Sequence, residues 1–216
     1  RDRLSPAIRS ILLASITAII VVGIGLFLAF LTRINAPGWF NRSIQTASLG
    51  YAIPGTVLGL GVLIVLSQFD DFSSQFLNLS FLPILSGSIF AVIFAYSLRF
   101  LSISFGTFEA ELSRIPKTTD MAASTLGART FQLLRLVHLP ILRPAILTAS
   151  VLVFVDTMKE LPATLILRPF NFETLATQVY NYASVGQIED AALPALIIVG
   201  IGIIPVFIAT RKLHKH

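Results

Sequence analysis

The sequence predicts an all-α, polytopic membrane protein with about five transmembrane helices and a cytoplasmic loop of the form helix–glycine–helix. Three observations predict this fold class. The chain is 55% hydrophobic and only 12% charged, with a mean hydropathy of +0.82, whereas ordinary globular domains carry about a quarter charged residues. Its apolar residues gather in runs close to the roughly 20 residues that cross a bilayer as a helix. One polar stretch, 109–140, divides these runs.

Two apolar runs precede this polar stretch near the N-terminus. The first, Ile8–Leu31, has only serine and threonine as polar breaks and is long enough to span a bilayer. The second predicted span is about Ile44–Leu66, with a kink expected at Pro54 because proline lacks the N–H that a helix interior requires. An acidic loop, Asp70–Ser80, is expected to follow.

The third predicted span begins near Pro83 and runs to about Phe105. Arg99 lies about 24 Å along this helix from its start, at 1.5 Å per residue. At that depth an arginine can extend its charged end to the far interface. We favour this structural role for Arg99 over a role in a transport path.

Two further spans follow the polar stretch. The fourth covers about Ile141–Met158 and resumes at Ala163–Arg168, and the last is about Ala191–Ala209. Five spans place the chain ends on opposite sides of the membrane. Because positive residues favour the cytoplasmic side, we place the polar stretch and the basic C-terminal tail in the cytoplasm. The arginines within the first nine residues then face outward, against the same rule.

The segment Asp120–Pro140, here called the knuckle, is predicted to form two short helices around a glycine. Asp120 suits a first helical turn, where a carboxylate interacts favourably with the helix dipole. Gly127 can adopt the left-handed conformation that commonly ends a helix. The knuckle could therefore seat a helix or loop of a partner, but the pattern also fits a surface hairpin that only links two spans.

Charged residues gather where the fourth span ends. Asp156 and Glu160 are four residues apart, so two carboxylates can share a helix face, with Lys159 beside them. Charges at membrane depth are costly and usually face a protein interior or a water path. Two interpretations remain open: a gate or way-station for a cation, since hard metal ions prefer oxygen ligands, or a structural ion pair. No metal ligand is assigned.

Several functions lack the residues they need. The three histidines form no HExxH, and the sequence contains no GxxxxGK[ST] phosphate loop and no cysteine. We therefore predict no enzyme activity, no nucleotide hydrolysis by this chain, and no bound cofactor. The net charge of +5 is attributed to cytoplasmic loops and not to nucleic-acid binding.

The knuckle resembles the coupling motif of ABC importer permeases, which reads Glu-Ala-Ala, three residues, Gly, nine residues, Ile, one residue, Leu-Pro. The matching positions keep this spacing throughout and are Met121, Ala122, Ala123, Gly127, Val137, Leu139 and Pro140. Met121 stands where the family carries an acid, and the neighbouring Asp120 can partly substitute for that charge. The resemblance implies that these residues couple the permease to ATPase subunits.

Two other stretches, Ala47–Leu63 and Val155–Ser184, resemble ferric-iron importer permeases, and the block Lys159–Thr164 is the part that points to iron. Such permeases contain two similar halves. The chain resembles the C-terminal half, so we expect residues 1–216 to be one transmembrane domain of a longer protein.

The resemblance implies alternating access in a bacterial inner membrane. Cytoplasmic ABC ATPase subunits would use ATP and grip one knuckle from each permease half, and a periplasmic binding protein would deliver ferric iron. Two alternatives remain open. One is the same transporter class with another cargo, such as sulfate, thiamine or a polyamine; the other is a membrane scaffold or sensor.

Overall fold

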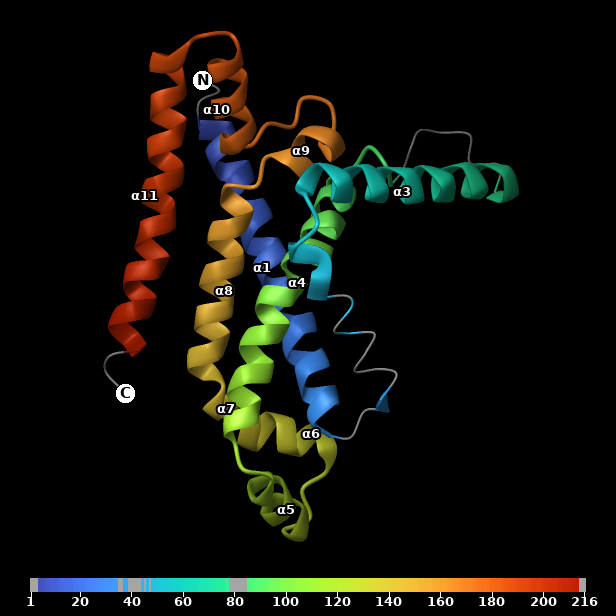
Figure 1. The fold of residues 1–216 in the computed structure, drawn as a ribbon, viewed down its shortest axis with the longest axis vertical. Helices are drawn as coiled ribbons and strands as arrows, with labels where there is room; N and C mark the ends of the chain where they lie inside the picture. Colours follow the sequence, from blue (N-terminus) through green and yellow to red (C-terminus); the bar gives the residue numbers. More distant parts are fainter. Residues whose placement is uncertain are drawn as a thin grey trace.

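The computed structural model describes residues 4–34, 37–38, 44, 46, 48–77 and 85–213. Within these residues all regular structure is helical (Figure 1). The elements are α1 (Leu4–Arg33), the 3₁₀ turn η1 (Ser48–Tyr51), α3 (Gly55–Leu77), α4 (Ile89–Arg114), α5 (Lys117–Thr125), α6 (Thr130–Gln132), the π-helix η2 (Leu133–His138), α7 (Leu139–Ile141), α8 (Arg143–Met158), α9 (Pro162–Leu167), α10 (Leu175–Ser184) and α11 (Ile188–Leu213).

Helices α1, α4 and α8 run side by side and form the centre of the bundle (Figure 1). Small residues let their backbones approach closely, as is usual between helices in a membrane. Ala95 of α4 and Ala149 of α8 are completely buried. A Cβ added at Gly25 of α1 would lie 2.7 Å from the Ser104 Cβ of α4. The spacing between α1 and α4 therefore depends on the absence of a side chain at Gly25.

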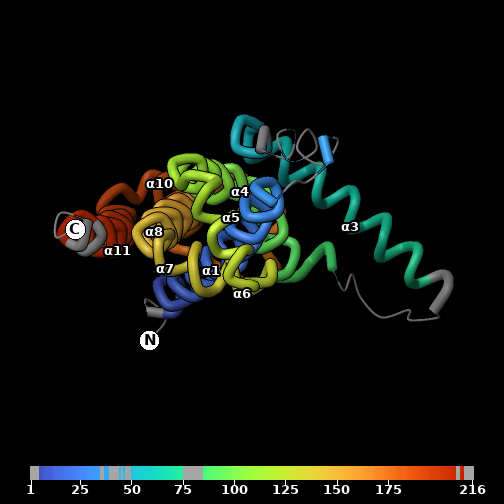
Figure 2. The backbone as a smooth tube through the Cα atoms, turned by 90° about the horizontal axis from the view of Figure 1, so that it is seen from below, coloured from blue at the N-terminus to red at the C-terminus, as the bar shows by residue number. Residues whose placement is uncertain are grey.

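Helix α11 lies at one side of the bundle, next to α8 and α10 (Figures 1 and 2). Its apolar side chains are largely exposed, including Leu196, Val199 and Ile203. Apolar side chains on a membrane helix can face lipid at no cost, so this exposure fits a helix at the edge of a bundle.

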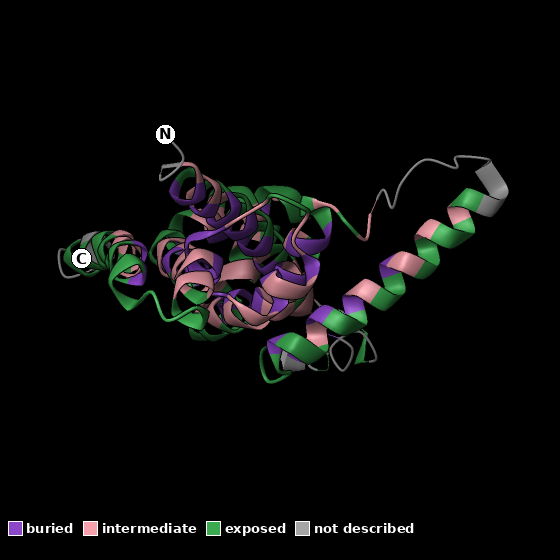
Figure 3. Cartoon of the chain, turned by 90° about the horizontal axis from the view of Figure 1, so that it is seen from above, coloured by how far each residue is buried: buried purple, intermediate pink, exposed green. Residues whose placement is uncertain are grey.

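Helix α3 departs from the predicted second span. It begins after Pro54 and continues through the acidic residues to Leu77, so Pro54 precedes the helix and does not kink it. The predicted acidic loop, Asp70–Ser80, is wrong for residues 70–77, because these residues are helical. The Asp70 carboxylate accepts hydrogen bonds from the backbone N–H groups of Leu85 and Ser86, although Asp70 itself lies within the helix. Figures 1 and 3 show α3 running crosswise, away from the bundle.

By length and composition, four helices of the described chain can cross a membrane: α1, α3, α4 and α11. A fifth span results when α8 is joined with the segment 130–141, which meets it at an angle of 75°. This confirms the all-α, polytopic fold class. Helix α4 begins at Ile89 and extends to Arg114, beyond the predicted end at Phe105, whereas the predicted start, Pro83, lies outside the described residues.

Candidate functional site

The knuckle forms the end of the molecule farthest from α10 (Figure 1), and Figure 2 views this end directly. Helix α5 carries Asp120 in its first turn and ends as predicted, with Gly127 at a φ of +84°. The Ala128 N–H then donates to the Ala123 carbonyl at 3.0 Å and closes the turn. Because this turn needs a positive φ, glycine is the residue that adopts it without strain.

Large apolar side chains cover the outer surface of the knuckle. Met121, Leu126, Phe131 and Leu136 are 64%, 89%, 70% and 67% exposed. The segment 130–141 is bent by 75° from α8, and we treat it, with α5, as lying at the membrane surface, so that α8 is the part of this bent pair that enters the membrane. Exposed apolar patches outside a bilayer commonly mark a surface that another protein covers.

The residues of the predicted coupling motif divide between this surface and the interior. Asp120, Ala123, Val137 and Leu139 are half-buried, whereas Met121, Ala122, Gly127 and Pro140 are exposed. The motif therefore does not form one contact face. Some of its members reach outward, and others hold the knuckle against the bundle.

Asp120 points inward and joins two residues that the sequence analysis did not single out. Its Oδ2 lies 2.7 Å from Nε of Arg33, the last residue of α1. Its Oδ1 lies 3.1 Å from Nε2 of His138, in η2. We call Arg33, Asp120 and His138 the inner cluster. It brings together residues up to 105 positions apart in the sequence.

The inner cluster is shielded from solvent. The side chains of Arg33, Asp120 and His138 are 7%, 20% and 0% exposed, and the ring of Phe30 lies 5.5 Å from that of His138. Burial lowers the pKa of His138 below its ordinary value, although the Asp120 carboxylate acts in the opposite direction. His138 is therefore neutral near pH 7, and Arg33 balances the charge of Asp120.

The charged residues near the end of α8 are arranged differently from the prediction. Because α8 ends at Met158, Asp156 and Glu160 do not share a helix face. Asp156 pairs with Lys159, with Oδ1 2.7 Å from Nζ. Glu160 turns toward another helix.

Glu160 pairs with Arg99 of α4, with Oε2 3.3 Å from Nε. The Arg99 side chain is only 17% exposed and also donates from Nη1 to the Ile53 carbonyl at 2.9 Å. A carboxylate and a carbonyl thus hold the Arg99 side chain, and its expected extension toward the membrane interface stays a prediction. We call Arg99 and Glu160 the α4–α9 pair, since Glu160 leads into α9.

Gly55, the first residue of α3, lies against the α4–α9 pair. A Cβ added there would come within 2.7 Å of Glu160 Oε1 and 3.1 Å of Arg99 Nη1. Close by, the Tyr96 and Thr164 hydroxyl groups are hydrogen-bonded to each other and completely buried. A polar core thus joins α3, α4 and α9. Among the described residues, no group of three or more His, Asp or Glu is arranged to hold a metal ion.

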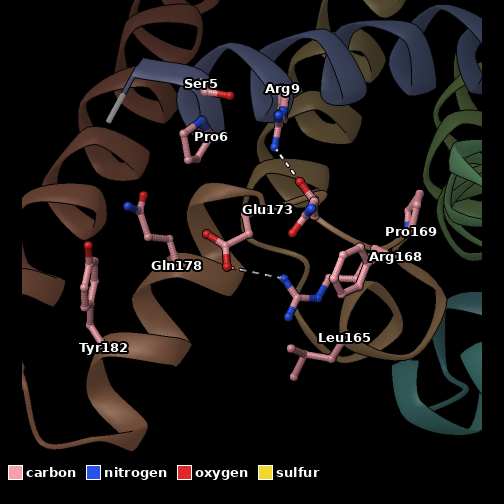
Figure 4. Close-up of a pocket in the computed structure, with 11 residues that line it drawn as sticks. Ser5, Pro6, Arg9, Leu165, Arg168, Pro169, Glu173, Gln178 and Tyr182 are labelled. Carbon is pink, nitrogen blue, oxygen red and sulfur yellow. Dashed lines mark hydrogen bonds and ion pairs between the residues drawn. The ribbon is translucent and has the colours of Figure 1, made fainter. Parts of the chain in front are cut away.

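A polar cavity of about 1000 Å³ (Figure 4) is lined by residues of α1, α9 and α10. The N-terminal end of α1, α9 and α10 lie at the opposite end of the molecule from the knuckle (Figure 1). Arg9 and Arg168 line the cavity together with Glu173, Gln178 and Tyr182. Arg9 Nη1 donates to a backbone carbonyl at 2.9 Å, and Arg168 Nη1 lies 3.7 Å from Glu173 Oε1. Among the described residues, the lining of the cavity therefore has one more cationic than anionic side chain.

Comparison with known proteins identifies the class of this fold. Residues 21–216 match the family described as "Binding-protein-dependent transport system inner membrane component". The chain belongs to this family of ABC importer permeases. Membership confirms the predicted family, the multi-pass location in the bacterial inner membrane, and the prediction that the chain is a membrane component without ATPase activity or a cofactor of its own.

Among curated relatives, the "Fe(3+)-transport system permease protein FbpB 2" of Haemophilus influenzae is 30% identical over 82% of this chain and 32% of its own length. The "Ferric transport system permease protein FbpB" of Actinobacillus pleuropneumoniae is 29% identical over 87% of this chain and 27% of its own. The "Putative 2-aminoethylphosphonate transport system permease protein PhnV" of Salmonella typhimurium is 30% identical over 69% of this chain and 52% of its own length. The chain thus spans between about a quarter and a half of these relatives.

Two solved structures share the fold at low sequence identity. The MetNI methionine ABC transporter gives a TM-score of 0.74 at 15% identity, covering 98% of this chain and 94% of that chain. A bacterial alginate ABC transporter in complex with a periplasmic protein gives a TM-score of 0.77 at 14% identity, covering 96% of this chain and 76% of that chain. At these identities the similarities show a shared helical fold.

Proposed function

We propose that this chain is one transmembrane half of a permease that imports ferric iron, driven by ATP that separate ABC ATPase subunits hydrolyse in the cytoplasm. The observation that carries the proposal is its likeness to ferric-transport permeases over 82–87% of the chain. A periplasmic iron-binding protein would deliver the cargo at the outer face, and a second permease half would complete the path.

The knuckle is the proposed contact with an ATPase subunit. Its exposed apolar side chains, Met121 and Leu126 in particular, offer a surface that a partner can cover. Gly127 sets the bend between the two arms of the knuckle. The half-buried Asp120 and Val137 would hold this surface in place without touching the partner.

The α4–α9 pair is the proposed gate, and Asp156 and Lys159 lie beside it. Glu160 is held by Arg99, so a passing cation would have to compete with a guanidinium for the carboxylate. Asp156 is already neutralised by Lys159, whose side chain is 62% exposed. We therefore assign Glu160 the gating role and assign Asp156 and Lys159 a supporting role at the end of α8.

A second candidate cargo is 2-aminoethylphosphonate. The PhnV relative and the FbpB 2 relative are both 30% identical to this chain. The PhnV match covers 69% of the chain, and the FbpB 2 match covers 82%. The cavity near Arg9 and Arg168 would suit an anionic phosphonate group, because arginine binds such oxygens with two parallel hydrogen bonds.

Transport by the full-length protein decides between these cargoes. It is reconstituted in vesicles with its ATPase subunits and binding protein and is then offered labelled ferric iron or labelled 2-aminoethylphosphonate. We expect iron to accumulate only with ATP and only when the ATPase subunits are present. Accumulation of the phosphonate alone would establish the second candidate, and accumulation of neither would refute both cargo assignments.

A further inference from the structure

We propose that Arg33 is a positioning residue that fastens α1, α4 and the knuckle into one rigid body. Its consequence for transport depends on the proposed coupling function, whereas the mechanical attachment itself does not. Arg33 ends α1, where a positive charge is favourable because the helix dipole is negative at its C-terminus.

The guanidinium of Arg33 closes the end of α4. It donates to the carbonyl of Leu112, to that of Ile115 at 3.0 Å and to that of Pro116 at 3.4 Å. The carbonyls of Leu112 and Pro116 also accept from the backbone N–H groups of Ile115 and Thr119, at 3.2 and 3.1 Å. Arg33 therefore adds a second donor to these two carbonyls and a donor to that of Ile115, and it holds the connection from α4 to α5 against the end of α1.

The remaining Nε donor of Arg33 binds the knuckle through Asp120 at 2.7 Å. The same carboxylate meets His138 on the opposite arm of the knuckle, and His138 packs against Phe30 of α1. One arginine thus connects the end of α1, the end of α4 and, through Asp120, both arms of the knuckle.

The surroundings of the inner cluster strengthen this connection. Ala29, Phe108, Leu112, Leu142 and Ala145 form a buried apolar cluster shared by α1, α4 and the start of α8. These side chains pack α1 against α4, while a cavity of about 270 Å³ lined by Arg33 and Lys117 opens beside them, so the Arg33 hydrogen bonds are only partly shielded from water. A force on the exposed face of α5 is therefore expected to move α1 and α4 together with it. The segment 130–141 of the knuckle meets α8 at a bend of 75°.

The attachment can be measured without any cargo. The chain contains no cysteine, so spin labels can be placed at Thr125 on α5 and Ile24 on α1, both exposed, after any other cysteine of the full-length protein is replaced. In vesicles, pulsed EPR should give one narrow distance for the parent protein and a broadened or split distance for Arg33→Gln. Arg114→Gln is the matched control, because this arginine is 74% exposed and pairs only with Glu111 among the described residues. An unchanged distance distribution in Arg33→Gln would overturn the proposal.

A second measurement separates positioning from general stability. In the reconstituted transporter, Arg33→Gln should still retain the ATPase subunits, yet import per ATP hydrolysed should fall by about fivefold or more, as for the loss of an ordinary coupling free energy. Arg33→Lys keeps the positive charge but loses the several N–H donors of the guanidinium. Its import per ATP hydrolysed should lie between that of the parent protein and that of Arg33→Gln. Full coupling in Arg33→Gln would refute the role in transmission.

The outcomes of the two measurements are distinguishable. If the parent transporter imports neither cargo, the proposed function fails, and the EPR comparison still decides whether Arg33 fastens the knuckle. If Arg33→Gln does not fold, the comparison is made with Arg33→Lys, for which a distribution identical to that of the parent would contradict the proposal.

Discussion

The knuckle and the junction between α8 and α9 are both breaks in helical rods, and each contains a buried arginine–carboxylate pair. They differ in what else the arginine contacts. Arg33 donates to three backbone carbonyls in addition to Asp120. Arg99 donates to one, that of Ile53, in addition to its pairing with Glu160 within the described chain.

This difference indicates how strongly each junction depends on its carboxylate. Loss of Asp120 leaves Arg33 with hydrogen bonds to three carbonyls, whereas loss of Glu160 leaves Arg99 with the Ile53 carbonyl and with the Tyr51 ring, whose centroid lies 6.0 Å away. An uncompensated buried charge is far more costly than a lost pair. The attachment made by Arg33 therefore keeps more of its contacts when its carboxylate is lost than the α4–α9 pair does.

The largest effect is expected from Gly127→Val. A β-branched residue at a φ of +84° strains the turn by roughly 1–3 kcal/mol, so the docking surface should lose its shape. We expect ATP-dependent uptake to be abolished while membrane insertion, followed by protease protection, remains normal.

Gly186→Val is the matched control. Gly186 has a φ of +78° and, like Gly127, no atom within 4 Å of an added Cβ, but it lies in the turn between α10 and α11. The strain should be similar and the uptake largely kept. Equal loss of uptake in both variants would show that the strain itself, and not its place in the knuckle, matters.

The two acidic residues should differ in their contribution to stability. Glu160→Ala should lower the free energy of unfolding by about 3–5 kcal/mol, because Arg99 is left buried and uncompensated. Asp120→Ala should cost less, about 1–3 kcal/mol, since the carbonyls still satisfy Arg33. Unfolding in mixed detergent micelles measures both values. A larger cost for Asp120→Ala would reverse the comparison.

A smaller effect is expected where α3 approaches the α4–α9 pair. Gly55→Ala places a methyl group 2.7 Å from Glu160 Oε1, and such overpacking typically costs about 1–3 kcal/mol. Gly61→Ala in the same helix meets nothing within 4 Å and should be neutral. The same unfolding assay compares them, and equal stabilities would mean that the pair yields to the added group without cost.

The smallest effect is expected from Lys159→Ala. Its side chain is 62% exposed, and its pairing with Asp156 is therefore screened by solvent. The free energy of unfolding should change by no more than about 0.5–1 kcal/mol, as for other exposed ion pairs. A change as large as that of Glu160→Ala would show that the end of α8 depends on this pair.

Local features of the fold could be predicted from the sequence. The helix stop at Gly127, Asp120 in a first turn and the resumption of helix after Pro162 all follow from the preferences of single residues. The helical spans follow from apolar runs. Such runs indicate that a segment is surrounded by lipid or protein, but they do not indicate which helix it packs against. These signals were sufficient for the fold class and for the position of the knuckle.

The partners of the buried charges could not be predicted. Arg33 and Asp120 are 87 residues apart, and no pattern in either segment indicates that they meet. Arg99 looked like an interfacial residue because depth along one helix does not show what a second helix brings beside it. The crosswise direction of α3 could not be predicted for the same reason, because an apolar run does not indicate the direction in which its helix leaves the bundle.

The π-helix η2 has a geometric consequence for the surface beside it. A π-turn contains one residue more than an α-turn, and each residue of an α-helix advances the side chains by about 100° around the axis. The extra residue therefore fixes the angular phase between Phe131, which points outward, and His138, which points inward. Deletion of a single residue within 133–137 would restore ordinary winding and rotate one of these two side chains out of register with the bundle.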